Sequence, residues 1–299
     1  MPNQPPTRLP RFTRAASSPG IALTERDLAI LHRVARHRFL TSRQIVRLVG
    51  RSPQPVLRRL QRLFHHGYLD RPRAQIDYFH RGGSQPLVYG LGRRSLPVLF
   101  PEGDTRPRVD NLNVGRLHLQ HTVLIAEVLI GIELACAHRA DARFVPEAEL
   151  RKDGSFRWSI MVHHRGASRR VGLVPDAVFA LERRGGKRAF YFLEADRGTM
   201  PVQRDSLSQS SFFRKLLAYA ATWNQELHRR KFGLHRFRVL TVTPSPLRAK
   251  HLAEAAAQLT SGQGLFLFGA AHSLSADNLL ACEWITGRIG VTSPLWDSN

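Results

Sequence analysis

The chain has 299 residues, of which 45 are basic and 23 are acidic, and its formal net charge is +22. This length allows two domains, with a sizeable core in the larger one. Its two cysteines, Cys136 and Cys282, lie far apart in apolar stretches, which excludes a four-cysteine zinc site and a disulfide framework.

The sequence shows no sign of a secretory or membrane segment. The N-terminus is rich in proline, and the longest apolar run, 122–137, is interrupted by Glu127 and Glu133. That run is shorter than a membrane span requires. We therefore expect a cytoplasmic protein without a membrane partner.

The positive charge is concentrated in the first hundred residues, which contain 18 arginines, no lysine and four acidic residues, a net charge of +14. A compact basic module is typical of a protein that binds a polyanion, because arginine–phosphate contacts release condensed counterions. Residues 1–22 are rich in proline and serine, and no acidic residue precedes Glu25. This composition predicts a disordered basic arm.

Residues 23–95 have the organisation of a winged helix-turn-helix. Capping residues and the helical spacing of apolar positions predict three helices, at about 24–37, 41–50 and 54–66. A polar, basic loop follows them, and the strand 87–91 completes the predicted wing.

The third helix of such a domain lies in the major groove of double-stranded DNA, because only that groove admits a helix and presents a distinct pattern for each base pair. We therefore expect basic and amide side chains of the helices and the wing to contact DNA. On the second and third helices these are Arg43, Gln54, Arg58, Arg59, Gln61 and Arg62, and in the wing they are Arg71, Arg73 and Arg81. Two alternatives stay open: the arginines form a solvated face, or the domain serves protein contact.

Residues 96–114 are rich in proline, glycine and asparagine and predict a linker to a second domain at 115–270, with a C-terminal extension at 271–299. A long helix at 115–138 opens the second domain. The expected strands are 143–150, 156–162, 172–181, 189–195, 238–243 and 265–268, and the expected later helices are 208–226 and 246–261. This order predicts a mixed sheet with helices on both faces, so the fold class is expected to be α+β or α/β. It is also the order of a restriction-endonuclease-like core.

Three carboxylates, Asp176, Glu194 and Asp196, lie on two of these apolar strands, which a short basic turn joins into a predicted hairpin. A buried carboxylate rarely stays ionised without a partner, because its desolvation is costly. Pro-Asp, followed after about 18 residues by Glu-x-Asp, resembles the PD-(D/E)xK nuclease motif. We therefore expect Asp176, Glu194 and Glu127, which lies on the apolar face of the long helix, to be ligands of Mg²⁺.

The motif departs from its usual form at the third position, where Asp196 stands in place of the lysine that polarises the attacking water. A carboxylate cannot act as that cation. Two arrangements would restore a nuclease: Asp196 binds a second metal ion, or Lys215 reaches the site from the next helix. The candidate catalytic residues are thus Asp176, Glu194, Asp196 and Lys215. In the alternative, a structural core, the acids pair with Arg197, Arg204 or Arg214.

Several segments together resemble the bacterial replication-relaxation family. They are the run 23–48, the strand 87–91, the helix start 117–122, the VPDAVF strand and FLEADRGT at 192–199. The resemblance covers roughly residues 23–270, and its most specific part is FLEADRGT with the helix that follows. Because Glu-x-Asp-Arg looks like the family's own form, the missing lysine need not be a local loss.

The resemblance implies a winged-helix DNA-binding domain fused to a nuclease-like domain, with a role in the replication or mobilisation of plasmids and integrated elements. Double-stranded DNA is the expected partner, a relaxase or replication proteins are further candidates, and a homodimer is a candidate assembly. The first hypothesis is a DNA-binding protein of a mobile element whose nuclease-like site is active or lost. The alternatives are an active metal-dependent endonuclease and a transcriptional regulator whose C-terminal domain senses a ligand or partner.

Overall fold

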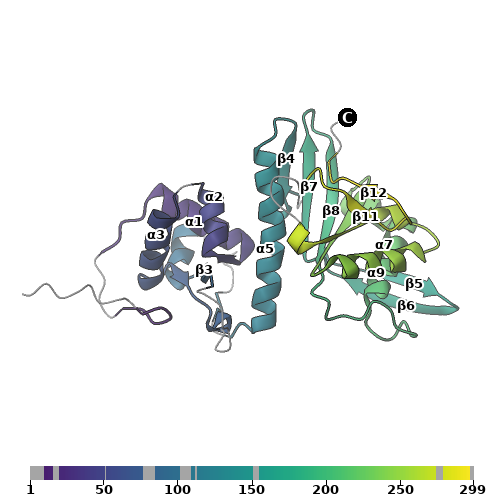
Figure 1. Cartoon of the computed structure of the whole chain (residues 1–299), viewed down its shortest axis with the longest axis horizontal. Coiled ribbons are helices and arrows are strands. Elements are labelled where there is room, and N and C mark those ends of the chain that lie inside the picture. Colours follow the sequence, from purple (N-terminus) through teal and green to yellow (C-terminus); the bar gives the residue numbers. More distant parts are fainter. Residues whose placement is uncertain are drawn as a thin grey trace, which may run out of the picture. The chain divides into compact units, whose positions relative to one another are not determined.

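The structure, a computed structural model, describes residues 10–15, 20–50, 52–76, 85–101, 109–111, 113–150, 155–273 and 279–296. It divides into two compact units, Met1–Glu127 and Val128–Asn299, and the boundary lies inside one long helix, α5 (Arg116–Ala137). Both helices and strands are well represented (Figure 1), which confirms the predicted α+β class.

The described part of the first unit begins with three helices, which are followed and interleaved by a small antiparallel sheet. The helices are α1 (Glu25–His37), α2 (Ser42–Val49) and α3 (Pro53–His65), and the strands are β1 (Phe39–Thr41), β2 (Leu69–Asp70) and β3 (Val88–Leu91). The strand order is β1-β3-β2, and β3 is antiparallel to both of its neighbours. A short helix, α4 (Leu96–Leu99), follows the sheet inside the segment predicted to be a linker. This order of elements is compatible with a winged helix-turn-helix.

Local capping chemistry explains where these helices begin and end. Thr24 caps α1 in a reciprocal capping box with Asp27, and Thr41 caps α2 in the same way with Gln44. Gly50 ends α2 in the left-handed conformation, with a φ of 65°, which a residue with a Cβ adopts only at a cost. The predicted helix positions in this unit are therefore confirmed.

Part of the predicted N-terminal arm packs against the first unit. The Arg14 guanidinium donates to the carbonyl of Phe64 at 3.1 Å and pairs with Asp70. The backbone amide of Ala15 donates to Nδ1 of His65 at 3.1 Å. The expectation of a disordered arm is therefore wrong for residues 10–15, while residues 1–9 and 16–19 lie outside the described part of the chain.

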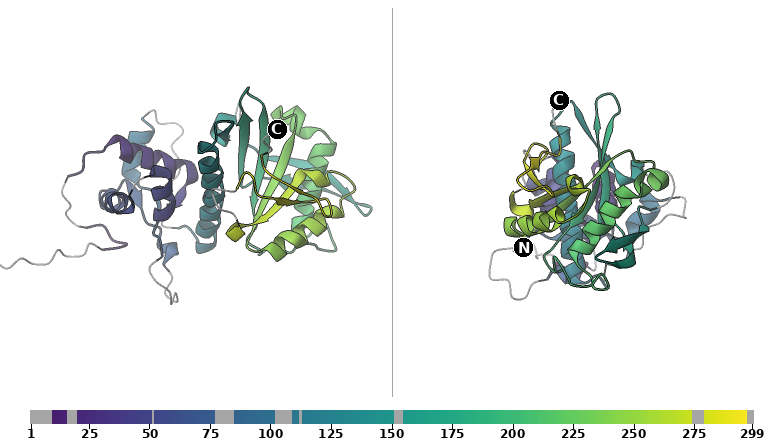
Figure 2. Two further views of the ribbon diagram at one scale, coloured as in Figure 1. Left: turned by 45° about the horizontal axis from the view of Figure 1, so that its top comes forward. Right: turned by 90° about the vertical axis from the view of Figure 1, so that its right-hand side faces the viewer.

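A seven-stranded mixed sheet forms the centre of the second unit (Figures 1 and 2). Its order is β12 (Thr292–Ser293), β11 (Trp284–Thr286), β10 (Phe266–Ala270), β9 (Phe237–Thr243), β8 (Arg188–Ala195), β7 (Ala177–Arg183) and β4 (Ala142–Pro146). Strands β8, β9 and β10 are parallel, and the remaining pairs are antiparallel. The predicted hairpin of the two acid-bearing strands is therefore confirmed as β7–β8.

Helices and a separate hairpin cover one face of this sheet. The helices are α7 (Phe212–Asn224) and α9 (Pro246–Ala257), and the hairpin consists of β5 (Trp158–His164) and β6 (Ala167–Leu173). Aromatic side chains join these layers: the ring of Phe192 on β8 lies 5.3 Å from that of Trp158 and 5.9 Å from that of Tyr219. Two short helices, α6 (Glu147–Leu150) and α8 (Leu227–Phe232), complete the unit.

Four details of the predicted second domain are wrong. The expected strand 143–150 ends at Pro146 as β4, and Glu147–Leu150 form the helix α6 instead. Residues 172–181 do not form one strand, because the segment from Val174 to Asp176 separates β6 from β7, and Pro175 cannot donate a ladder hydrogen bond. The predicted strand 156–162 corresponds to β5, which pairs only with β6 in its own two-stranded sheet. The segment 271–299 supplies β11 and β12, so it extends the central sheet rather than following it as an appendage.

Helix α5 is the one helix among the described residues that is long and apolar enough to cross a membrane, with a hydropathy of 1.6. The core helix of a soluble protein passes the same test. Leu119 of α5 packs in a cluster with Phe39 and Val88, and Gln44 Nε2 donates to the carbonyl of Val123 at 3.2 Å. These contacts are those of a core helix, so α5 is only weak evidence for a membrane span.

Candidate functional site

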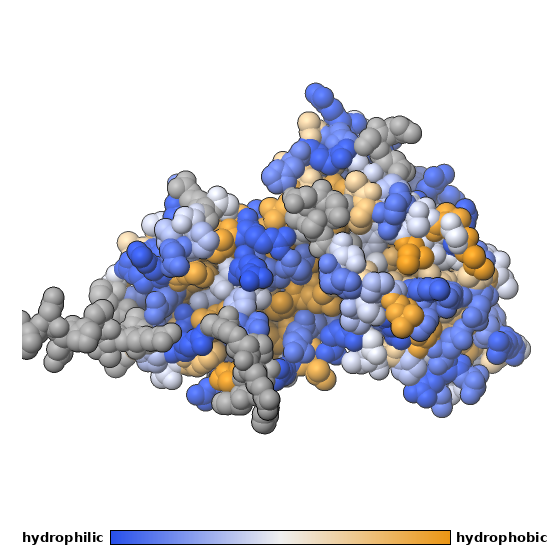
Figure 3. Space-filling view, viewed as in Figure 1, coloured by the Kyte–Doolittle hydropathy of each residue, from blue (hydrophilic) through white to orange (hydrophobic). Residues whose placement is uncertain are grey.

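Three exposed arginines of the first unit lie on α2 and α3. Arg43, Gln54, Arg58 and Arg62 are exposed, whereas Val56, Leu60 and Leu63 of α3 are buried. Between Asp27 and Asp70 the chain has no acidic residue, so no carboxylate of these helices neutralises the arginines. On the visible side of the molecule, hydrophilic side chains cover much of this unit (Figure 3). Apart from Arg47 of α2, which pairs with Glu127, these arginines leave a net positive charge on the two helices.

Arg59 does not lie on that surface. Its guanidinium binds both carboxylate oxygens of Asp27, with a distance of 2.6 Å from Nε, and donates to the carbonyl of Ala22 at 2.7 Å. Asp27 is fully buried. Burial by itself would raise the pKa of Asp27, but hydrogen bonds from Arg59 and Thr24 outweigh it and hold the pKa below its ordinary value. The structure therefore corrects the prediction that Arg59 faces DNA.

Arg71 is likewise turned into the first unit. Its guanidinium lies 4.1 Å from the ring centroid of Phe64 and donates to the Tyr89 hydroxyl at 3.1 Å and to the Arg11 carbonyl at 2.6 Å. The prediction that Arg71 serves the wing is therefore corrected as well. Of the remaining candidates, Arg73 is exposed, Gln61 is half-buried and Arg81 lies outside the described residues.

The second candidate site lies where β7 begins and β8 ends. Asp176 immediately precedes β7 and is opposite Glu194, because the antiparallel register pairs Ala177 with Leu193. The backbone confirms this position: the amide of Asp176 donates to Leu193 at 3.0 Å, and Asp176 Oδ2 accepts from the amide of Ala195 at 2.8 Å. Two carboxylates are therefore brought to neighbouring strands on the side of the sheet that α7 covers.

Helix α7 supplies both partners of Glu194. Lys215 Nζ lies 2.6 Å from Oε2, and the Tyr219 hydroxyl donates to Oε1 at 2.7 Å. These two residues are four apart, so they project from the same face of the helix. Glu194 is only 2% exposed. We call Asp176, Glu194, Asp196 and Lys215 the carboxylate–lysine cluster.

Burial dominates the electrostatics of this cluster. It raises the pKa of Glu194, although Lys215 opposes the shift, and it raises the pKa of Tyr219 well above the ordinary value. Burial alone would lower the pKa of Lys215, but the charges of Glu194, Asp176 and Asp196 outweigh it and raise that pKa. Lys215 thus stays protonated as the cation that the three surrounding carboxylates require.

Asp196 has a separate cationic partner, Arg248 on α9. The Arg248 guanidinium donates to Asp196 at 2.7 Å and to the carbonyl of Met200 at 2.5 Å, while the Gly198 amide donates to Asp196 at 3.2 Å. The sequence did not single out Arg248, which lies 52 positions from Asp196. Arg214, one of the three arginines expected as partners, instead binds Leu207, Ser208 and Ser210.

These groups do not fit a resident metal ion in the observed arrangement. Lys215 and Tyr219 occupy both oxygens of Glu194, and among the described residues no three His, Cys, Asp or Glu side chains are grouped as metal ligands. Glu127 belongs to the first unit, where it binds Arg47 and accepts from Gln44 Nε2 at 2.8 Å. The structure thus gathers Asp176, Glu194, Asp196 and Lys215 as predicted, but gives Glu127 other partners.

A family model described as replication-relaxation matches residues 31–236. The chain belongs to the replication-relaxation family. Membership connects it with the replication or relaxation of a plasmid or mobile element. The matched region includes α2, α3 and all four residues of the carboxylate–lysine cluster, but it ends before Arg248. Comparisons with curated proteins and with solved structures returned no match.

Proposed function

We propose that this chain is a double-stranded-DNA-binding accessory protein in the replication or relaxation of a plasmid or integrated mobile element. The observation that carries the proposal is the acid-free surface of α2 and α3, with exposed Arg43, Arg58 and Arg62. A surface of this kind attracts the phosphate backbone, because each arginine that reaches a phosphate releases counterions. The arrangement of three helices and a small sheet supports a winged helix-turn-helix as the DNA-binding module.

The geometry of α3 supports groove binding by that module. Arg58 and Arg62 are four residues apart, so they lie one above the other on the helix, away from the buried Val56 and Leu60. Arg62 also donates to the carbonyl of Gly20 at 3.2 Å. Arg58 has no hydrogen-bonding partner among the described residues, so its guanidinium is available for a phosphate or a base edge.

The second unit supports an accessory role rather than cleavage. The order α5, β4, β7, β8, α7, β9 supports a restriction-endonuclease-like core, but both Glu194 oxygens and Asp196 are engaged by the protein's own side chains. In this proposal the core positions partners at the DNA that the first unit binds. A relaxase or a replication protein is the expected partner.

Binding of a labelled duplex that carries the native flanking DNA tests the proposal by fluorescence anisotropy. The double variant R58Q/R62Q is expected to bind at least about tenfold more weakly than wild type, because two phosphate or base contacts are lost. The matched control, R169Q/R170Q, removes the same charge from exposed positions of β6. Equal affinities for the two double variants would overturn the proposal.

A second candidate function, a divalent-metal-dependent endonuclease, is favoured by one observation: Asp176 lies opposite Glu194 with Lys215 beside them. Cleavage would require Lys215 to leave Glu194 so that a cation can reach that carboxylate. Supercoiled plasmid carrying the native flanking DNA, incubated with Mg²⁺ or Mn²⁺, separates the two functions. Nicking by wild type that is lost in D176N/E194Q, while duplex binding persists, would replace the accessory role with the endonuclease.

A further inference from the structure

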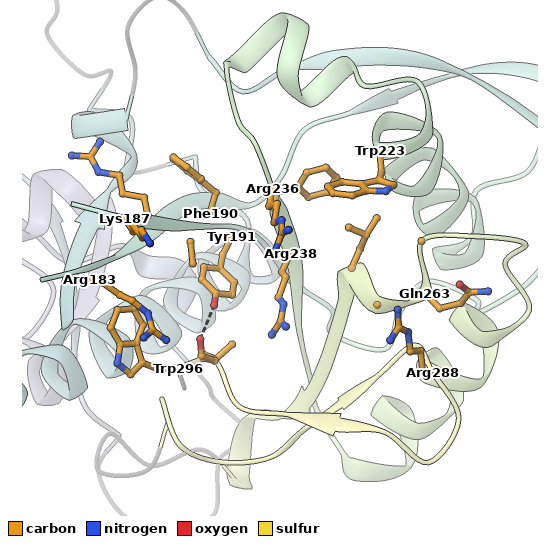
Figure 4. Close-up of a pocket in the computed structure, with 17 residues that line it drawn as sticks. Arg183, Lys187, Phe190, Tyr191, Trp223, Arg236, Arg238, Gln263, Arg288 and Trp296 are labelled. Carbon is orange, nitrogen blue, oxygen red and sulfur yellow. Dashed lines mark hydrogen bonds between the residues drawn. The ribbon is translucent and has the colours of Figure 1, made fainter. Parts of the chain in front are cut away.

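A cavity in the sheet-bearing unit lies away from the carboxylate–lysine cluster. Its volume is about 640 Å³, and it is formed where β8, β9 and β10 begin (Figure 4). Glu194 and Asp196 lie where β8 ends. With a rise of about 3.3 Å per strand residue, Phe190 in this cavity is roughly 20 Å from Asp196. The cavity is therefore a separate site, of a size that accepts a small ligand.

Cations line this cavity, and none of its lining residues is acidic. The six basic residues are Arg183, Lys187, Arg188, Arg236, Arg238 and Arg288. Arg188 is neutralised by an ion pair with Glu182 at 2.5 Å. Such an excess of positive charge is costly to hold together without an anion, because the arginines repel one another.

Three of these cations are available to a ligand. Lys187, Arg236 and Arg288 are exposed, and none has a side-chain hydrogen bond or ion pair to a described residue. The Arg288 guanidinium lies beside the backbone at Gly264, where an added Cβ would be 3.2 Å from Nη2. Arg238 donates to the Ser293 hydroxyl at 2.9 Å.

Aromatic side chains flank the cations. Figure 4 shows Arg236 and Arg238 in the middle of the cavity, with Trp223 on one side and Trp296 beside Arg183 on the other. Trp296 is buried and already carries Arg183 over its ring at 4.7 Å. Trp223 is half-buried and stacks on His228, with ring centroids 4.7 Å apart. Because Trp296 is buried and Trp223 is only half-buried, we assign the stacking of a planar base to Trp223.

We propose that this cavity binds a nucleotide unit, with its phosphate on Arg236, Arg238 and Arg288 and its base against Trp223. Guanidinium groups recognise phosphate oxygens with directed hydrogen bonds, and indole rings stack on any base. Two sources present this chemistry, a single-stranded DNA segment and a free nucleotide. The proposal does not rest on duplex binding by the first unit, because every lining residue belongs to the second unit.

The test uses the full chain and two probes, a fluorescein-labelled oligothymidylate and ATP. Anisotropy measures oligothymidylate binding, and isothermal titration calorimetry measures ATP binding. The variant R236Q/R288Q is compared with R169Q/R170Q, which has the same charge but leaves the cavity intact. A third variant, W223L, removes the stacking surface, and its folding is checked by circular dichroism.

For a single-stranded ligand, R236Q/R288Q is expected to weaken oligothymidylate binding about tenfold relative to R169Q/R170Q, and the salt slope should fall by about 1.4. W223L should weaken the same binding by about tenfold. For a free nucleotide, ATP binds wild type, competes with the oligonucleotide and fails to bind R236Q/R288Q. Either pattern supports the proposal.

Two results would overturn it. One is oligothymidylate and ATP binding that is the same in R236Q/R288Q and R169Q/R170Q. The other is a loss of binding in R236Q/R288Q that is equal for oligothymidylate and duplex DNA, with no effect of W223L. The latter result would make the cavity part of a duplex-backbone surface without base recognition.

Discussion

Replacement of Lys215 by methionine tests how the buried carboxylate of Glu194 is stabilised. The variant keeps a side chain of similar length but removes the cation that lies 2.6 Å from Glu194 Oε2. Glu194 is almost fully buried, whereas the side chain of Lys215 is 32% exposed. The variant therefore leaves a buried carboxylate that accepts a hydrogen bond from the Tyr219 hydroxyl but has lost its cation.

The expected loss of stability follows from this geometry. At 2.6 Å the gross attraction is about 6 kcal/mol for an effective dielectric constant of about 20. Desolvation of both ions offsets part of it, and partial exposure of Lys215 screens the pair, so we expect a net loss of about 3 kcal/mol at pH 7.5.

The loss is expected to depend on pH with a defined sign. Burial raises the pKa of Glu194 in the folded protein, and removal of Lys215 raises it further. A folded-state pKa above the unfolded value of 4.5 means that the folded variant binds the proton more tightly. The stability of K215M therefore falls as the pH rises above about 4.5, and its deficit relative to wild type shrinks to about 1 kcal/mol near pH 4.5.

Urea unfolding followed by tryptophan fluorescence measures this deficit specifically. All four tryptophans, Trp158, Trp223, Trp284 and Trp296, lie in the second unit, so the signal reports that unit alone. The control is K250M on α9, whose exposed lysine makes only a long 4.0 Å pair with Glu254, and it should cost less than about 0.5 kcal/mol.

The double variant K215M/E194Q provides the rescue, because it removes the buried charge together with its partner. It should recover most of the stability lost by K215M at pH 7.5. A K215M deficit that is the same at pH 4.5 and pH 7.5, or no rescue by E194Q, would refute the role assigned to this ion pair.

Three further predictions concern the first unit. This unit contains no tryptophan, so its unfolding is followed by calorimetry, as the transition that tryptophan fluorescence does not report. R59M should destabilise it by about 3 kcal/mol at pH 7, because Asp27 would be buried without its cation; a transition unchanged from wild type would contradict this. His37 has a pKa lowered by burial from 6.5 to about 4, so stability should fall by up to about 3 kcal/mol as the pH drops from 6.5 to 4. H37F should remove that dependence, and the same pH profile in H37F would contradict the assignment. G92A should lower the transition temperature by several degrees, because its Cβ would lie 2.1 Å from the Gly67 carbonyl oxygen, and an unchanged temperature would show that this backbone can move apart.

The parts of the fold that depend on neighbouring residues could be predicted from the sequence. The caps at Thr24 and Thr41 and the left-handed stop at Gly50 are local features, and the structure contains each of them. The β7–β8 hairpin was also predictable, because its two apolar strands are joined by a short turn. The pairing of β5 could not be predicted, because a strand's partner depends on contacts between residues distant in the chain. In the structure β5 pairs with β6 outside the central sheet.

In the candidate site too, local features could be predicted from the sequence and contacts between distant residues could not. The motif predicted that Asp176 and Glu194 would lie on neighbouring strands, and the arrival of Lys215 from the next helix was one of two arrangements left open. The hairpin register and α7 bring these residues together with Asp196. Periodicity could not predict Arg248 as the partner of Asp196, because no local pattern relates residues so far apart. The same limit applies to Arg59, since helical spacing places it beside Arg58 but does not reveal the buried Asp27.

The salt dependence of duplex binding tests the central claim, DNA contact by α3, most directly. Association constants for the native flanking duplex would be measured across a salt series for wild type, R58Q/R62Q and R169Q/R170Q. Loss of two phosphate contacts predicts that the slope of log K against log salt becomes shallower by about 1.8 in R58Q/R62Q and stays at the wild-type value in R169Q/R170Q. A wild-type slope in R58Q/R62Q would contradict the assignment of α3 as the DNA-binding surface.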